Sequence, residues 1–299
     1  MRAGRAVRAG RRPDPRLVPV PGPADSLAAL AALPGVDEAA TAAREACTEL
    51  RWHQALRRRI PEAAAESRVR GARASAALEG AEVDVAVVRD LMRGALAWPT
   101  EPDPLEQVLR GVVQATAETE HVRGLVGSAP LQALARLHVA GAAGLVAPEQ
   151  LGRPRQPGEG CAELVDLGPA PDADVVSARL AGLVELLTAL DSAPAVIVAA
   201  LVHAEIAVVR PFVRGNGAVA RAMERAVVQA SGLDPTGVAV PEAGHGAQGG
   251  AAYLGALTAY GTGSREGVAL WLTHCAQAVV TGAREGQRIA DAVLAGRLG

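Results

Sequence analysis

Apolar residues recur at every third or fourth position along most of the chain, which is the spacing of one buried helical face. The segments with this period are bounded by glycine, proline or polar capping residues, which mark helix ends. The predicted helices cover residues 27–33, 37–60, 62–79, 84–92, 105–125, 131–142, 174–190, 195–209, 218–229, 251–260 and 267–298. No region is rich in strand patterns, and the hydrophobic pattern therefore predicts an all-α protein.

Proline, glycine and arginine interrupt the helical pattern and divide the chain. Residues 1–25 are rich in these three residue types and have no hydrophobic period, so they are predicted to form a flexible leader. Residues 26–104 are predicted to form an N-terminal helical region, and residues 105–299 a core region. Further irregular segments are predicted at 98–104, at 152–157 as a loop or short hairpin, and at 232–250 as a long loop.

Composition narrows the kind of core and the kinds of partner. Hydrophobic residues occupy 49% of the 299 positions and aromatic residues only 2%. The core must therefore consist of Ala, Val and Leu, as in closely packed helices. The chain has no lysine, and its 30 arginines and 32 acidic residues give a net charge of −2. This balance excludes the general positive charge of a nucleic-acid-binding protein.

Cysteine spacing and hydropathy indicate in which part of the cell the protein is expected. The three cysteines follow no metal-binding or redox spacing, which favours a reduced chain. The most apolar stretch, residues 193–209, contains His203 and Glu205 and therefore predicts a buried helix rather than a membrane span. The first residues contain no continuous apolar stretch of a secretory signal. We expect a soluble, cytoplasmic protein with no membrane partner.

A Gly-Asn-Gly turn separates two of the predicted helices. Such a turn directs backbone N–H groups outward at a helix N-terminus, where they can bind an anion. Arg210, Arg214 and Arg221 flank the turn and supply positive charge suited to phosphate. Phe212 and Asn216 are the only phenylalanine and asparagine in the chain, and we expect a packing role for the first and a turn role for the second. The turn is thus a predicted anion site.

The same segment resembles the signature of the Fic, or Fido-domain, family, His-x-Phe-x-Asp/Glu-Gly-Asn-Gly-Arg-x-x-Arg. The matching positions are Phe212, Gly215, Asn216, Gly217 and Arg221, and Pro211 fits the common His-Pro-Phe form. The resemblance extends over about residues 105–275. It implies a Fic-like helical bundle with a short β-hairpin near the active-site loop. It also implies that a nucleotide or phosphate is bound by Arg214, Gly215, Asn216, Gly217 and Arg221.

A second motif lies on the helix predicted at 62–79. The segment from Ser75 to Gly80, Ser-Ala-Ala-Leu-Glu-Gly, resembles the inhibitory motif found on an N-terminal helix of many Fic proteins. The resemblance implies that Glu79 forms a salt bridge with Arg221 and competes with the γ-phosphate of the nucleotide. Without the resemblance, Glu79 would be interpreted as an exposed carboxylate at a helix end.

The chain departs from the family signature at three chemical positions. Arg210 stands where the family has the histidine that takes a proton from the target hydroxyl, and a guanidinium with a pKa above about 12 cannot accept one. Arg214 replaces the acidic residue that holds Mg²⁺, and it has no lone pair to offer a cation. Ala218 replaces the first signature arginine. The resemblance therefore implies impaired adenylyl transfer, with no Mg²⁺ held.

No other residue is a convincing substitute base. His203 lies two helical turns before Arg210, about 10 Å away along the helix, and is expected to be a packed helix residue. His245, in the glycine-rich loop at 232–250, is interpreted as solvated. No spacing links the remaining histidines to the turn; these are His53, His121, His138 and His274.

Three functions fit these observations. The first is a degenerate Fic protein that binds ATP, another nucleotide or a phosphate without metal and acts by binding or regulation. The second is an active Fic-type adenylyltransferase that transfers AMP to a hydroxyl of a protein target by a changed mechanism. The third is a structural interaction module whose Gly-Asn-Gly turn is architectural. Labelled ATP distinguishes the second from the first, and anion binding distinguishes the first from the third.

Overall fold

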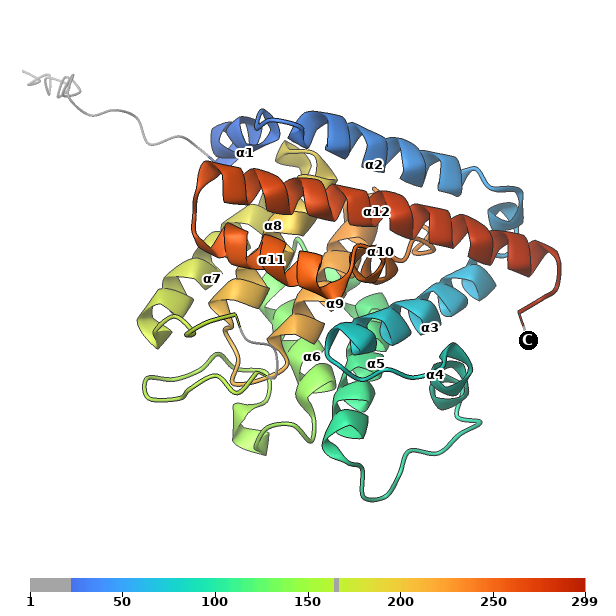
Figure 1. Cartoon of the computed structure of the whole chain (residues 1–299), viewed down its shortest axis with the longest axis horizontal. Helices are drawn as coiled ribbons and strands as arrows, with labels where there is room; N and C mark the ends of the chain where they lie inside the picture. Colours follow the sequence, from blue (N-terminus) through green and yellow to red (C-terminus); the bar gives the residue numbers. More distant parts are fainter. Residues whose placement is uncertain (1–22, 164–166, 299) are drawn as a thin grey trace, which may run out of the picture.

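The computed structural model describes residues 23–163 and 167–298, and this part of the chain is built from α-helices (Figure 1). In chain order these are α1 (Pro23–Ala31), α2 (Val36–Arg51), α3 (Ile60–Leu78), α4 (Val85–Met92), α5 (Pro104–Val122), α6 (Pro130–Ala142), α7 (Ala173–Thr188), α8 (Ala195–Val209), α9 (Asn216–Ala230), α10 (Pro241–Ala247), α11 (Gly250–Gly261) and α12 (Arg265–Leu294). The predicted all-α fold class is confirmed.

The helix boundaries differ from the predicted ones near the N-terminus. Helix α1 begins at Pro23, inside the predicted leader, and the rest of that leader lies outside the described residues. The helix predicted at 37–60 ends at Arg51, and a 3₁₀ turn at Gln54–Arg57 separates it from α3. Helix α5 begins close to its predicted start because Asp103 caps it and Pro104 suits its first turn.

The structure corrects one of the predicted irregular segments and decides between the two alternatives given for another. The long loop predicted at 232–250 contains α10, which starts at Pro241. Residues 152–163 form an irregular loop rather than the paired strands of a hairpin. The one β-bridge among the described residues joins Ala143 to Val146.

Helix α8 lies at the centre of the molecule and is buried along most of its 15 residues. Apart from His203 and Glu205 it is apolar on every face, which is typical of a helix surrounded by others. Helices α9 and α12 pack against it, and Trp271 of α12 donates its indole N–H to the carbonyl oxygen of Ala200 at 2.7 Å. Among the described helices, none is long and apolar enough to cross a membrane.

The N-terminal helices share the core of the rest of the chain. Helix α2 lies along α12 (Figure 1), and Leu27, Leu50 and Ala64 belong to the same hydrophobic cluster as Val293. A smaller cluster lies between α3, α4 and α5. The regions predicted at 26–104 and 105–299 thus pack into one unit, with α3 against α5, α9 and α10.

Candidate functional site

The Gly-Asn-Gly turn joins the buried helix α8 to the N-terminus of α9. Helix α8 ends at Val209, and Arg210 follows with a left-handed φ of 49°. Arg210 is the only non-glycine residue with positive φ among the described residues. Gly215 has a φ of 86°, which favours glycine. The turn therefore depends on Gly215, whereas Arg210 adopts a conformation that is uncommon for its residue type.

Asn216 and Phe212 hold the turn together. The side chain of Asn216 accepts a hydrogen bond from the Phe212 N–H at 2.8 Å and donates one to the Phe212 carbonyl at 2.9 Å. Phe212 is buried, and its ring stacks on that of His138 at a centroid distance of 3.8 Å. The turn is thus anchored both to itself and to α6, which carries His138.

His138 connects the turn to the loop after α6. Its Nδ1 accepts a hydrogen bond from the Gly152 N–H at 2.8 Å, so its Nε2 carries the proton and donates to the Arg214 carbonyl at 3.2 Å. Burial lowers the pKa of His138 to about 4, and the Arg214 carbonyl opposes this only in part. Both ring nitrogens are occupied, which leaves no free nitrogen to act as a base.

The guanidinium of Arg210 does not face an open anion site. It is buried and donates to the carbonyl oxygens of Gly168 and Pro169, each at 2.8 Å. The carbonyl of Arg210 in turn accepts a hydrogen bond from Arg155 at 2.8 Å. These hydrogen bonds hold the segment before α7 against the turn, and the favourable effect of the Arg210 charge on a phosphate stays a prediction.

Arg221 lies on α9 with all three of its guanidinium nitrogens bonded. Its Nη2 and the Glu79 carboxylate form an ion pair at 2.5 Å, and its Nε donates to the Ser75 hydroxyl at 2.7 Å. Its Nη1 donates to the Tyr253 hydroxyl at 3.2 Å. The contact expected between the two motifs is thus present, with Arg221 only 2% exposed; its inhibitory effect stays a prediction.

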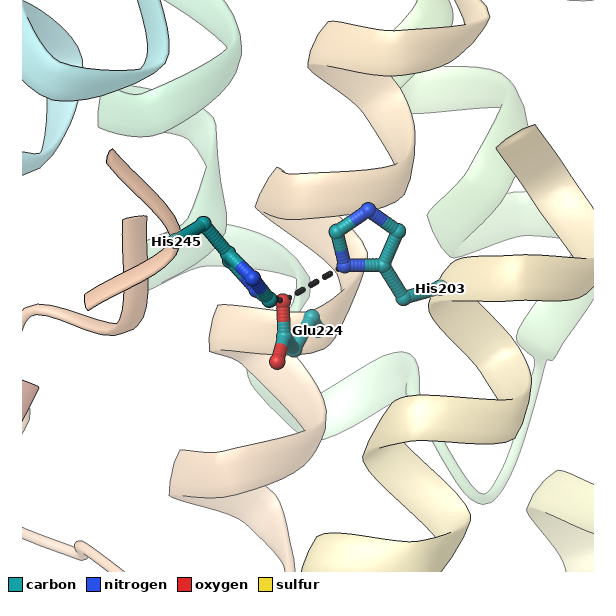
Figure 2. Close-up of side chains that lie close together, drawn as sticks. All are labelled: His203, Glu224 and His245. Atoms are coloured by element: carbon teal, nitrogen blue, oxygen red, sulfur yellow. Dashed lines mark hydrogen bonds and ion pairs between the residues drawn. The ribbon is translucent and has the colours of Figure 1, made fainter. Parts of the chain in front are cut away.

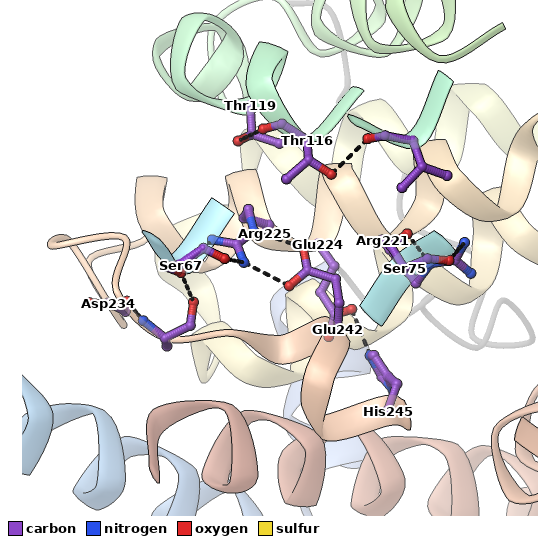
Figure 3. A network of polar contacts seen from close by, with 12 residues as sticks. Ser67, Ser75, Thr116, Thr119, Arg221, Glu224, Arg225, Asp234, Glu242 and His245 are labelled. Carbon is purple, nitrogen blue, oxygen red and sulfur yellow. Dashed lines mark hydrogen bonds and ion pairs between the residues drawn. The ribbon is translucent and has the colours of Figure 1, made fainter. Parts of the chain in front are cut away.

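A second arginine of α9, Arg225, also forms a hydrogen bond with α3, the helix that contains Ser75. Arg225, one turn after Arg221, forms hydrogen bonds with Glu242 of α10 at 2.7 Å and with the Ser67 hydroxyl at 3.1 Å (Figure 3). Ser67 and Ser75 both belong to α3, so each of the two arginines binds a serine of that helix. Breaking the Glu79 contact alone would therefore leave α3 attached to α9 through Arg225.

A carboxylate occupies the predicted anion site. One oxygen of Glu163, Oε1, accepts hydrogen bonds from the backbone N–H of Asn216 at 2.7 Å and from its side-chain amide at 2.5 Å. Burial and the nearby charge of Glu79 raise the pKa of Glu163, while the amide groups of Asn216 and Gly215 act in the opposite direction. The N-terminus of α9 thus already binds an anion, which comes from the chain itself.

The two carboxylates leave little space beside the turn. Glu79 lies over the first turn of α9, because a Cβ placed on Gly217 would collide with its carboxylate. A cavity of about 20 Å³ lies between Glu79, Glu163 and Arg221, and one of about 10 Å³ adjoins Arg214. The larger holds about one water molecule, whereas ligand pockets usually measure about 300 Å³ or more. A nucleotide could enter only if these carboxylates moved.

Two further histidines, His203 and His245, lie in the interior near Arg221. Tyr253, which accepts from Arg221, is also hydrogen-bonded to His203 Nε2 at 2.8 Å. His203 is a packed helix residue, as expected. The interpretation of His245 as a solvated loop residue is wrong, because it lies on α10 and is fully buried.

Comparison with known proteins agrees with the motif. Residues 128–227 match the model of the Fic/DOC family, a span that contains α6, α8, the turn and most of α9. The chain has a Fic domain. No match was found among curated proteins.

Solved structures support the fold over a longer part of the chain. Fic-1 (residues 134–508) from C. elegans has a TM-score of 0.64 and 18% identity, covering 87% of this chain and 73% of that one. A Fic family protein from Desulfovibrio desulfuricans G20 has a TM-score of 0.61 and 20% identity, covering 84% and 74%. A Fic domain containing signaling protein from Bacteroides thetaiotaomicron has a TM-score of 0.60 and 12% identity, covering 85% and 98%. These likenesses include the helices N-terminal to the Fic domain.

Two residues of the site were not predicted from the sequence. Glu163 lies in a segment rich in glycine and acidic residues, and His138 follows no spacing that relates it to the turn. The only general indication was that the free N–H groups of a helix N-terminus favour an anionic partner. That indication does not say which carboxylate supplies it.

Proposed function

We propose that this protein binds a phosphate-bearing ligand, such as a nucleotide, at the turn before α9 without Mg²⁺, and that it does not transfer AMP efficiently. The observation that carries the proposal is that the Glu163 carboxylate accepts hydrogen bonds from the backbone and side-chain amide groups of Asn216. A phosphate oxygen has the same charge and accepts the same hydrogen bonds. The Glu79 carboxylate forms an ion pair with Arg221, so a ligand oxygen could take its place there as a second contact.

The chemistry of the turn supports binding over transfer. A transferase needs a base within hydrogen-bond reach of the attacking hydroxyl. Arg210 cannot accept a proton, and its guanidinium is bonded to backbone carbonyls. His138, the histidine that contacts the turn, already uses both ring nitrogens. The Fic chemistry therefore lacks its proton acceptor at the usual place.

The residues at the turn do not fit the Mg²⁺ of the family. The position that would hold it is Arg214, whose guanidinium repels a cation. Relative to the family signature, replacing a neutral histidine and an acidic residue with arginine adds three positive charges, and Ala218 removes one. This net gain of two equals the charge of Mg²⁺, so the polyphosphate can be neutralised by arginines alone.

Calorimetric titration with ATP in EDTA tests the binding. We expect weak binding to the unchanged protein and affinity about tenfold higher or more in Glu79→Gly and Glu163→Ala variants, because each carboxylate must leave before a phosphate can enter. The gain should be largest in the double variant. Glu62→Ala, which removes an exposed carboxylate from the start of α3, is the matched control and should leave the affinity unchanged.

Two outcomes contradict the proposal. Binding that requires Mg²⁺ would mean that a metal site exists after all. Absence of binding in the Glu79→Gly, Glu163→Ala double variant would reduce the turn to an architectural element of an interaction module. A folded state confirmed by circular dichroism is needed for each variant, since Glu79 belongs to a buried ion pair.

Glu163 also favours a second candidate, an active adenylyltransferase. Its pKa is raised by burial and by Glu79, and a carboxylate with a raised pKa beside an anion site is suited to accept a proton. In this candidate Glu163 replaces the missing histidine as base. The target would be a hydroxyl group of a protein, as the family resemblance implies.

Incubation with ATP labelled on its α-phosphate separates the two candidates. We expect no protein labelling by the Glu79→Gly variant, and labelling once Arg210→His, Arg214→Asp and Ala218→Arg are added to it. Labelling by Glu79→Gly alone, lost on adding Glu163→Ala, would favour the transferase with Glu163 as its base.

A further inference from the structure

Three buried polar side chains from three helices lie close together in the interior, near Arg221. His203 of α8 and His245 of α10 both contact the same oxygen of Glu224 on α9, Oε2, at 2.6 Å and 2.9 Å (Figure 2). One nitrogen of each histidine and a carboxylate oxygen all lie within 4.8 Å of one another. The three side chains are at most 1% exposed. Their approach is therefore enforced by the packing of α8, α9 and α10.

The outer nitrogen of each histidine is also held. His203 Nε2 faces the Tyr253 hydroxyl at 2.8 Å, and His245 Nδ1 faces His274 Nε2 at 3.1 Å. Histidines that bind metals usually have their second nitrogen fixed by such an outer partner, which sets the orientation of the ring. The inner nitrogens of both rings consequently point at one place, beside Glu224.

Glu224 has one oxygen without a partner. Its Oε1 is the only buried side-chain nitrogen or oxygen among the described residues with no hydrogen bond. A buried carboxylate oxygen without a partner is unfavourable, and a bound cation would satisfy it.

We propose that His203, Glu224 and His245 form a Zn²⁺ site in the interior of the Fic domain. The ligands are His203 Nδ1, His245 Nε2 and the Glu224 carboxylate. On binding, each ring proton moves to the outer nitrogen, which faces Tyr253 or His274. Zn²⁺ accepts this set of nitrogen and oxygen ligands, whereas Mg²⁺ and Ca²⁺ prefer oxygen alone.

The site has a structural rather than a catalytic position. Zinc at about 2.1 Å from each ligand requires His203 Nδ1 and the carboxylate oxygen, now 2.6 Å apart, to separate to about 3.3 Å, an increase of about 0.7 Å. The ion would then join α8, α9 and α10 directly. Because Tyr253 lies between His203 and Arg221, the same ion would fix the orientation of Tyr253 beneath the turn.

Metal content of the untagged full-length chain tests the proposal. The protein is unfolded, refolded with ZnCl₂, freed of excess metal by gel filtration and analysed by mass spectrometry for zinc. We expect one zinc per chain, and a content lower by about tenfold or more in His203→Ala and His245→Ala variants. His121→Ala, which changes an exposed histidine of α5, is the control and should retain the full content.

Refolding with CoCl₂ keeps the test decisive where a variant fails to fold. Co²⁺ in place of Zn²⁺ gives visible absorption bands whose intensity reports a low-coordinate site with nitrogen ligands, and the unchanged protein should show them. A wild-type chain that holds neither metal after refolding overturns the proposal. Zinc retained in full by a folded His203→Ala, His245→Ala double variant does so too. Neither outcome depends on nucleotide binding.

Discussion

His138 illustrates at the residue scale how a single buried side chain joins three segments. Its ring stacks on Phe212, and its two nitrogens bond to the backbone of Arg214 and Gly152. These contacts require the neutral ring with its proton on Nε2. Burial accordingly lowers the pKa of His138 to about 4, well below the 6.5 typical of an unfolded chain. Protonation is therefore incompatible with the folded turn.

The shift predicts a loss of stability in acid. Below about pH 6.5 the unfolded chain binds a proton at His138 that the folded chain does not bind until about pH 4. The free energy of unfolding should therefore fall by about 2 kcal/mol between pH 8 and pH 5 through this group. In urea unfolding, His138→Gln should lose less stability than wild type over this range. An equal loss would contradict the prediction, and His121→Gln, exposed on α5, serves as control.

At the scale of elements, α10 and α12 approach each other backbone to backbone. A Cβ on Gly244 of α10 would collide with the Ala278 carbonyl oxygen of α12, and one on Gly282 would collide with the backbone of Val240. Two glycines on opposite helices thus allow this contact. The approach matters for the interior of the domain, because it places His245 beside Glu224.

Substitution at Gly244 tests this contact. Gly244→Ala should lower the free energy of unfolding by about 2 kcal/mol, since an added methyl group must separate two packed backbones. Gly246→Ala is a matched control in the same helix, because a Cβ there meets nothing within 4 Å. It should be neutral or stabilising by up to about 1 kcal/mol. Equal effects in urea unfolding would mean that α10 and α12 can move apart at no cost.

At the scale of the whole molecule, one hydrophobic cluster extends from α1 to α12. Leu50 of α2 is fully buried against α12, and a Cβ on Gly286 of α12 would collide with its side chain. The helices before the Fic domain therefore complete its core instead of forming a separate layer. This arrangement also keeps α3, with Glu79, close to the turn.

A shared core predicts one cooperative unfolding transition. Leu50→Ala should destabilise the protein by about 3 kcal/mol and lower the single melting temperature seen by calorimetry and by circular dichroism. Leu131→Ala removes a side chain that is 51% exposed and should change little. Two separate transitions in Leu50→Ala would show that the N-terminal helices unfold on their own.

The sequence was sufficient for features that depend on neighbouring residues. The hydrophobic period predicted the all-α fold, and the Gly-Asn-Gly turn between two helices indicated the candidate site. Helix formation, capping and a turn with positive φ are local properties, so they can be inferred from short stretches of sequence. The boundaries of α1 and the presence of α10 were missed because glycine- and proline-rich segments carry a weak local preference, which tertiary packing can override.

By itself, the sequence thus determined the helical class, the match to the Fic signature and the arginines that stand at the histidine and acidic positions of that signature, since these are matters of residue type at given positions. Only the tertiary structure decided that Glu163 occupies the turn, that Arg210 faces backbone carbonyls, and that two histidines meet at Glu224. Glu163 and Asn216 are 53 positions apart, and Arg210 and Gly168 are 42 apart. Contacts at such separations depend on how whole helices pack, and no local pattern encodes them.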